Sequence, residues 1–188
     1  MAGEVPSARR VELVDAAYAY ALDNGLAGAS LRPVAEAIGS STGVLRFLFG
    51  SKDGLVRAVL GRARQDELEM LARLPADGDL HDVSLEVWEW LADPGHAPVL
   101  RLWVESYATA LVDPDGPWGD FARQTVDDWL ALLARAQPSG VRRTAAGAAQ
   151  RTAILAVLRG GLLDLLATGQ RTRVTRAVRN GIDALAAP

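Results

Sequence analysis

The sequence predicts an all-α fold of about nine helices. Apolar residues recur at three- and four-residue spacing in almost every long segment, which is the period of a helix with one buried face. No segment alternates between apolar and polar residues for long, so the pattern predicts no strand. Breaks rich in glycine, proline, serine and aspartate separate the periodic segments.

The first three predicted helices are closely spaced, and glycine ends each of them. The first carries its apolar face up to Asn24–Gly25, a usual helix end. Ser30 is the expected N-cap of the second helix, which ends at Gly39. Ser41 is the expected N-cap of the third, which ends at Gly50–Ser51.

Longer helices are predicted for the rest of the chain. Their expected ranges are 52–74, 80–92, 97–112, 117–136, 142–168 and 171–186. Residues 75–79 form the first stretch with the composition of a linker. The remaining breaks fall at 93–95, 113–117, 138–140 and Gly169.

Length and composition are typical of a globular protein. The chain has 188 residues, of which 49% are hydrophobic and 23% charged. It has no cysteine, which excludes disulfides, thiolate zinc sites and a cysteine nucleophile. No apolar run reaches the ~18 residues of a membrane span, and the first ten residues lack the apolar core of a signal peptide. We therefore expect a cytoplasmic protein without a membrane partner.

The formal net charge of −3 conceals an uneven distribution of charge. Residues 1–64 hold 8 basic and 6 acidic side chains, residues 65–128 hold 3 and 15, and residues 129–188 hold 9 and 2. Binding to a polyanion depends on the charge of the contacting face rather than on the total. The net charge therefore does not exclude a nucleic-acid partner.

Residues 30–55 carry the clearest functional pattern. Two short helices joined by the turn Gly39-Ser40-Ser41 have the layout of a helix-turn-helix, whose second helix can enter the major groove of DNA. Helix pairs joined by a glycine turn are common in all-α proteins. The spacing alone is therefore only moderately specific for DNA binding.

The residues within this segment add specificity. The segment contains the run Leu31-Arg32-Pro33-Val34-Ala35-Glu36-Ala37-Ile38-Gly39, followed by Ser41, Gly43, Leu45, Phe49, Ser51-Lys52-Asp53 and Leu55. With this spacing, the segment resembles the TetR family of transcriptional regulators. The close match covers about residues 10–60, and the remainder is similar in architecture only. The resemblance implies a helix-turn-helix domain over 1–54, a linking helix at about 52–74, and an effector-binding and dimerisation domain over 55–188.

The resemblance also implies a function. We expect a dimeric repressor that binds a palindromic double-stranded operator and is released by a small hydrophobic effector, with no enzymatic activity and no cofactor. The resemblance puts Thr42, Gly43, Val44 and Phe47 at base edges. It puts Ser30, Arg46 and Lys52 at phosphates. The full DNA-contacting set implied is Ser30, Ser41, Thr42, Gly43, Val44, Arg46, Phe47 and Lys52.

Two positions depart from the family pattern. Arg46 replaces the usual tyrosine and can still contact a phosphate. Leu48 replaces the usual histidine and cannot, so it either costs one backbone contact or packs into the core of the domain. Arg9 and Arg10 are expected either to reach DNA from a flexible arm or to form a solvated end.

Aromatic residues concentrate in the middle third, where the resemblance implies a ligand cavity. The expected lining residues are Trp88, Trp103, Tyr107, Phe121 and Trp129. Glu89 and Glu105 lie near them in the sequence and suggest a cationic aromatic ligand. The alternative is that most of these rings are core residues and most of the acidic side chains are solvated.

The last two predicted helices are the expected dimer interface, as the resemblance implies. One face of each is apolar, and together these faces contain Ile154, Leu158, Gly161, Leu162, Leu165, Val174, Val178 and Ile182. Two such helices from each subunit can form a four-helix bundle. The alternative is that these apolar stripes form the core of a single chain.

Other functional classes have weaker support in the sequence. His81 and His96 are far apart for a metal pair and are expected to be surface residues, so no metal site is predicted. No nucleophile elbow, phosphate loop or dinucleotide fingerprint is present. The main alternative is a helical small-molecule-binding module without specific operator binding. A small helical enzyme using carboxylates such as Glu89 and Glu105 is a third possibility.

Overall fold

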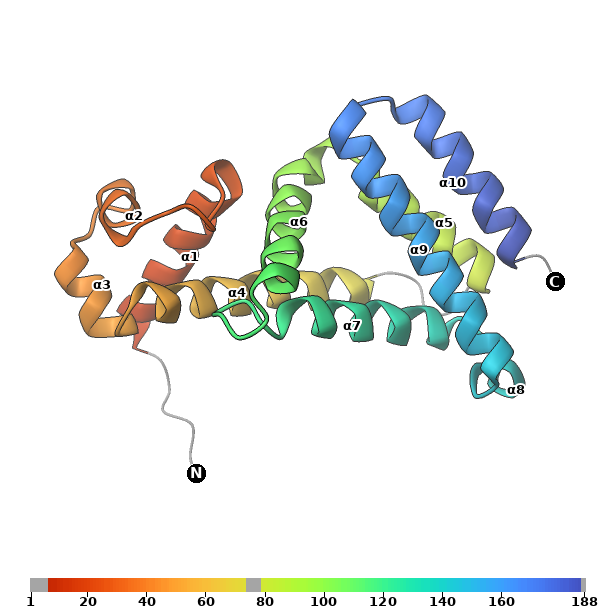
Figure 1. The fold of residues 1–188 in the computed structure, drawn as a ribbon, viewed down its shortest axis with the longest axis horizontal. Coiled ribbons are helices and arrows are strands. Elements are labelled where there is room, and N and C mark those ends of the chain that lie inside the picture. Colours follow the sequence, from red (N-terminus) through yellow and green to blue (C-terminus); the bar gives the residue numbers. More distant parts are fainter. Residues whose placement is uncertain (1–6, 74–78, 187–188) are drawn as a thin grey trace. The chain divides into compact units, whose positions relative to one another are not determined.

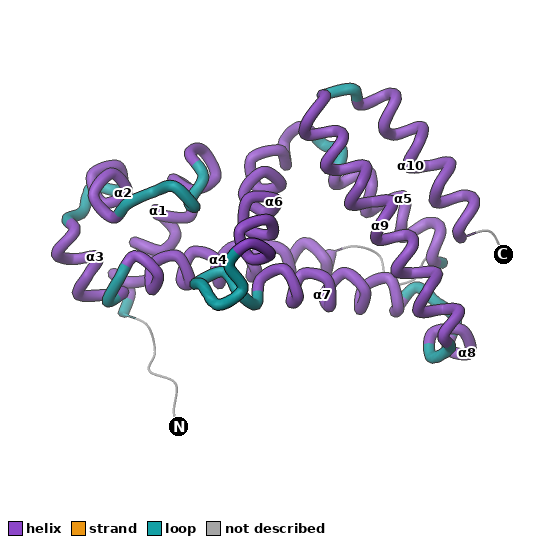
Figure 2. Tube along the Cα trace, viewed as in Figure 1, coloured by secondary structure: helices purple, strands orange, loops and turns teal. Residues whose placement is uncertain are grey.

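The computed structural model describes residues 7–73 and 79–186, and all regular structure in this part of the chain is helical (Figure 2). The all-α prediction is therefore confirmed. Most of the expected linker at 75–79 lies outside the described residues. The helices are α1 (Ala8–Asn24), α2 (Leu31–Ala37), α3 (Thr42–Phe49), α4 (Lys52–Arg73), α5 (Leu80–Leu91), α6 (Ala97–Val112), α7 (Phe121–Arg135), α8 (Ser139–Arg142), α9 (Ala145–Thr168) and α10 (Arg171–Ala186), with one 3₁₀ turn at Pro94–His96.

Two of the predicted helices begin later than the pattern indicates. The one expected at 117 begins at Phe121, because residues 114–120 form tight turns. The one expected at 142 begins at Ala145, where the Thr144 hydroxyl accepts a hydrogen bond from the Gly147 N–H at 3.0 Å. The predicted break at 138–140 is also wrong in part, since α8 begins directly after Pro138.

The chain divides into two compact units, which are described separately. The first contains residues 1–67 and 101–122, and the second contains residues 68–100 and 123–188. This division differs from the one expected at residue 54, because α6 joins the N-terminal helices. Leu102, Ala110 and Trp118 are buried in the same apolar cluster as residues of α1 and α4. No helix among the described residues is long and apolar enough to cross a membrane.

Polar contacts of Arg62 join α1 to α4 within the first unit. The Arg62 guanidinium donates to the Asp15 carboxylate at 2.9 Å, lies over the Tyr18 ring at 5.3 Å and bonds to Asp66. Burial raises the pKa of the Tyr18 hydroxyl, and a hydrogen bond with Asp66 raises it further. Tyr18 therefore stays neutral at physiological pH.

In the second unit, α9 and α10 form an antiparallel pair that packs against α5 (Figure 1). Trp88 of α5 is fully buried, and its indole N–H donates to the Thr175 hydroxyl at 3.2 Å. A Cβ added at Gly161 would lie 2.3 Å from Val178 and 3.0 Å from Trp88. Gly161 therefore lets the three helices approach closely.

This packing corrects the interface expected from the sequence. Six of the eight expected interface residues are at most 3% exposed within one chain: Ile154, Leu158, Leu162, Val174, Val178 and Ile182. Gly161 is also buried, and Leu165 is half-buried. Buried side chains have almost no surface left to bury against a second copy. The two apolar stripes therefore form core within one chain, as the alternative interpretation held.

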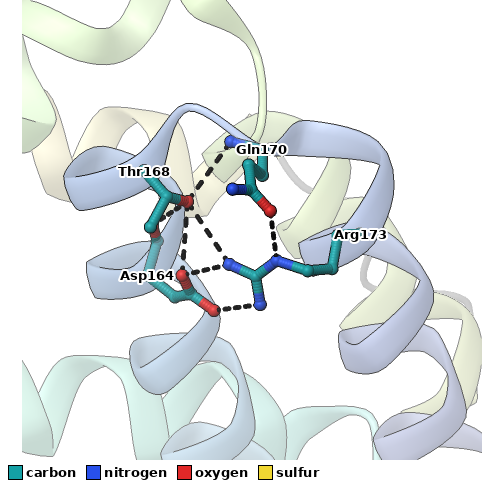
Figure 3. Close-up of polar contacts among 4 residues, drawn as sticks. All are labelled: Asp164, Thr168, Gln170 and Arg173. Atoms are coloured by element: carbon teal, nitrogen blue, oxygen red, sulfur yellow. Dashed lines mark hydrogen bonds and ion pairs between the residues drawn. The ribbon is translucent and has the colours of Figure 1, made fainter.

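Arg173 fixes the turn between α9 and α10 (Figure 3). Its guanidinium donates to both Asp164 carboxylate oxygens, at 2.8 and 2.5 Å, and its Nε donates to Gln170 at 2.7 Å. These hydrogen bonds lower the pKa of Asp164. Gly169 ends α9 with a φ of 67°, so this connection combines a left-handed cap with a bidentate ion pair.

Candidate nucleic-acid interface

Apolar contacts hold α2 and α3 together as a helix-turn-helix. Val34, Ala35, Leu45 and Phe49 belong to one buried cluster. Gly39 has a φ of +63°, which glycine adopts without strain and which lets the chain turn sharply after α2. The predicted pair of short helices and its turn are therefore present.

The two expected N-cap serines differ in their contacts. The Ser41 hydroxyl accepts a hydrogen bond from the Val44 N–H at 3.2 Å and caps α3 as predicted. Ser30 occupies the N-cap position of α2, but its side chain makes no capping hydrogen bond. Since Ser30 is exposed, its hydroxyl can bond to a phosphate.

One side of α3 faces solvent. Thr42, Gly43 and Arg46 are exposed, Val44 is 40% exposed and Phe47 is 88% exposed. An aromatic ring so exposed on a short helix gains nothing from the fold of this chain, and such rings often mark binding surfaces. The exposed side carries a hydroxyl, a guanidinium and two apolar groups, which suit base edges, a phosphate and thymine methyl groups respectively.

Leu48 and the basic residues of α1 make contacts within the chain. Leu48 is half-buried and packs against the cluster of the first unit, in agreement with the core alternative. Arg9 pairs with Glu12 at 2.8 Å, and the Arg10 guanidinium lies 5.2 Å from the centre of the Phe49 ring. Both arginines lie in the first turn of α1, so the expectation of a flexible arm is wrong for them.

The turn between α3 and α4 depends on a glycine that the sequence pattern did not indicate. A Cβ added at Gly54 would lie 1.9 Å from the Phe49 carbonyl oxygen. The Ser51 hydroxyl accepts from the Gly54 N–H at 3.1 Å. This close approach fixes the start of α4, where Lys52 is exposed and donates to the Ala27 carbonyl at 3.3 Å.

Both carboxylates expected near a cationic ligand have partners within the chain. Glu105 accepts hydrogen bonds from the N–H groups of Leu26 and Ala27. Glu89, in the second unit, is exposed and pairs with Arg179 at 3.2 Å. Both carboxylates therefore make contacts within their own unit.

The five expected pocket residues are divided between the two units. Trp103, Tyr107 and Phe121 belong to the first, and Trp88 and Trp129 belong to the second. Trp88 has no exposed surface because α5, α9 and α10 enclose it, so it lines no cavity. Trp103 and Tyr107 share one face of α6, as their spacing predicts, and stack with their centroids 5.2 Å apart.

The two histidines contact different residues. His96 stacks on Trp90. Asp79, His81 and Asp82 lie close enough to hold a metal ion, but both His81 ring nitrogens bond to carboxylates, those of Asp183 and Asp82. These bonds raise the pKa of His81, and the neutral imidazole is the form that binds metal. The Asp79 carboxylate also caps α5.

The fold and the exposed side of α3 define a helix-turn-helix protein with a second, helical unit. Residues 13–59 match the sequence model of the bacterial regulatory proteins of the tetR family. The chain is 29% identical over 110 residues to the "HTH-type transcriptional regulator BetI" of Paraburkholderia phytofirmans, a match that covers 56% of each chain. It therefore spans about half the length of that curated relative. These matches identify residues 13–59 as a tetR-family helix-turn-helix region, and they support a TetR-family regulator.

Solved structures share this fold over nearly the whole chain. A transcriptional regulator from Rhodococcus sp. Rha1 has a TM-score of 0.78 at 21% identity, covering 94% of this chain and 95% of that one, which shows a common fold. The multidrug binding protein EbrR, in complex with imidazole, has a TM-score of 0.69 at 27% identity, covering 93% and 90%. Further EbrR structures contain proflavin and ethidium.

Proposed function

We propose that the protein is a repressor that binds a palindromic operator as a dimer, through α2 and α3, and is released by a small hydrophobic effector. The exposed Phe47, on the same side of α3 as Thr42 and Arg46, is the observation that carries the DNA-binding part. The match of residues 13–59 to the tetR family model supports the regulatory role. The exposed α3 side chains favour this function over the alternative of a small-molecule-binding module without operator recognition.

The proposed dimer interface is the exposed face of α9. Ala149, Thr152, Ala156, Gly160 and Leu163 are exposed, and their three- and four-residue spacing puts them on one side of the helix. Most of them are small, which allows close approach of a second helix, and Leu163 is a large apolar side chain that is 47% exposed. This face lies opposite the core residues Leu158 and Leu162.

Substitutions in α3 and at Lys52 are expected to change DNA binding in different ways. Lys52→Ala removes a proposed phosphate contact, so it should weaken binding to all sequences and reduce the salt slope by about 1. Thr42→Ala and Phe47→Ala remove proposed base contacts and should change which sequences are preferred. Fluorescence anisotropy with a panel of labelled duplexes at several salt concentrations measures both effects. A uniform loss for all three variants would contradict the assignment of the base-reading residues.

We propose that the effector is an aromatic molecule that contacts Trp103 and Tyr107. The Trp103 indole N–H is buried and has no acceptor among the described residues, which favours a ligand that carries one. The EbrR complexes with proflavin and ethidium support an aromatic ligand.

Two fluorescent probes of similar shape test this effector proposal without DNA. Acridone is neutral and carries a carbonyl acceptor, whereas proflavin is a cation. The anisotropy of each probe should rise with wild-type protein and with Trp90→Ala, the control, and should not rise with Trp103→Ala. Binding of proflavin alone would support the cationic alternative, and full binding by Trp103→Ala would contradict the site.

A further inference from the structure

The connection between α1 and α2 is held by a carboxylate from a distant part of the chain. The Leu26 N–H donates to Glu105 Oε2 at 3.0 Å, and the Ala27 N–H donates to Glu105 Oε1 at 2.8 Å. Glu105 lies on α6, 79 residues beyond Leu26 in the sequence. Both carboxylate oxygens are therefore occupied by backbone donors of one short loop.

Gly25 gives the carboxylate room to approach. A Cβ added there would lie 3.0 Å from Glu105 Oε1 and 3.1 Å from Oε2. Gly25 also has a φ of 73° and a ψ of 176°, a region that only glycine adopts readily. The loop conformation and the contact with Glu105 thus depend on the same residue.

The opposite side of the same loop contacts the proposed DNA-binding surface. The Ala27 carbonyl accepts a hydrogen bond from the Lys52 Nζ at 3.3 Å. Ala27 therefore bonds to Glu105 through its N–H and to Lys52 through its carbonyl. An ammonium has three donors, so Lys52 can bond to Ala27 and still contact a phosphate. Ser30, another proposed phosphate contact, follows Ala27 by three residues in the chain.

We propose that Glu105 is a positioning residue for operator binding: its carboxylate fixes the loop at residues 25–30, and through Ala27 the loop orients Lys52 toward a phosphate. This inference rests on the proposed DNA-binding function. Without the carboxylate, the N–H groups of Leu26 and Ala27 lose their acceptors, and the loop relaxes toward conformations that satisfy them with water. The Ala27 carbonyl then no longer holds Lys52 in one place.

A double-mutant cycle between Glu105 and Lys52 tests this coupling in the full-length protein. Glu105→Ala should weaken operator binding on the order of tenfold, as should Lys52→Ala. The double variant should bind about as well as Lys52→Ala alone, because Glu105 acts through Lys52. Glu105→Gln keeps one carbonyl acceptor and should recover part of the affinity. Glu89→Ala, which removes an exposed carboxylate of the second unit, is the control and should bind as the wild type does.

Hydrogen exchange separates positioning from a general loss of stability. Glu105→Gln should show faster exchange at the Leu26 and Ala27 amides, with unchanged exchange in α1 and α4. Additive losses in the cycle, or wild-type affinity for Glu105→Ala, would overturn the proposal even if the wild type binds DNA. A wild-type protein that binds no duplex would instead contradict the proposed function on which this inference rests.

Discussion

Truncation of Trp88 to alanine is expected to lower the free energy of unfolding by about 3–5 kcal/mol. The indole is fully buried between α5, α9 and α10 and donates to Thr175, so its removal leaves a cavity and removes this hydrogen bond. Domains of this size are stable by only ~5–15 kcal/mol. Urea denaturation followed by far-ultraviolet circular dichroism measures the loss, because the helices report unfolding independently of tryptophan fluorescence.

Trp90→Ala is the matched control, two residues away on the same helix. Trp90 is half-buried and stacks on His96 with their centroids 4.1 Å apart. Trp90→Ala should lower the free energy of unfolding by less than Trp88→Ala does, because less of the Trp90 side chain is buried. Equal losses for the two variants would contradict the enclosed position of Trp88.

Arginine substitutions on the exposed face of α9 are expected to produce monomers and to lower operator affinity by about 100-fold or more. Ala156→Arg and Leu163→Arg put a charge on the proposed dimer interface. A monomer contacts one half-site at a time and loses the gain from binding two sites together. Sedimentation velocity measures the oligomeric state, and fluorescence anisotropy measures the affinity.

Two further variants serve as controls, one at an exposed apolar position outside the proposed interface and one in the core. Leu111→Arg changes an apolar side chain of α6 that is 64% exposed, and it should leave the dimer intact. Leu158→Arg instead places a charge at a position that is 1% exposed, so it should unfold the chain rather than release folded monomers. A folded, dimeric Leu163→Arg variant with full operator affinity would contradict the proposed interface.

The sequence predicted those features that depend on local signals. Helix periodicity and caps such as Ser41 depend on residues within a few positions of each other, so the helices and the helix-turn-helix were predictable. The start of α9 was misplaced because Thr144, its actual cap, follows another short helix that the sequence pattern did not indicate.

Long-range contacts explain what the sequence did not predict. An apolar stripe such as Ile154, Leu158 and Leu162 has the same pattern whether it packs inside one chain or between two. The contact between Glu105 and the Leu26 amide joins residues 79 positions apart, and no pattern in either segment indicates it. Gly54 likewise looks like any helix glycine until the Phe49 carbonyl is seen against it.

Selection of duplexes from a random pool by the wild-type protein tests the central claim most directly. If two α3 helices of a symmetric dimer read DNA, the selected sequences should contain two inverted half-sites whose centres lie about 34–36 Å apart, or a multiple of that distance. Phe47→Ala, taken through the same selection, should enrich a different half-site. Enrichment of no sequence by the wild type, or of a half-site that Thr42→Ala and Phe47→Ala leave unchanged, would contradict operator recognition by α3.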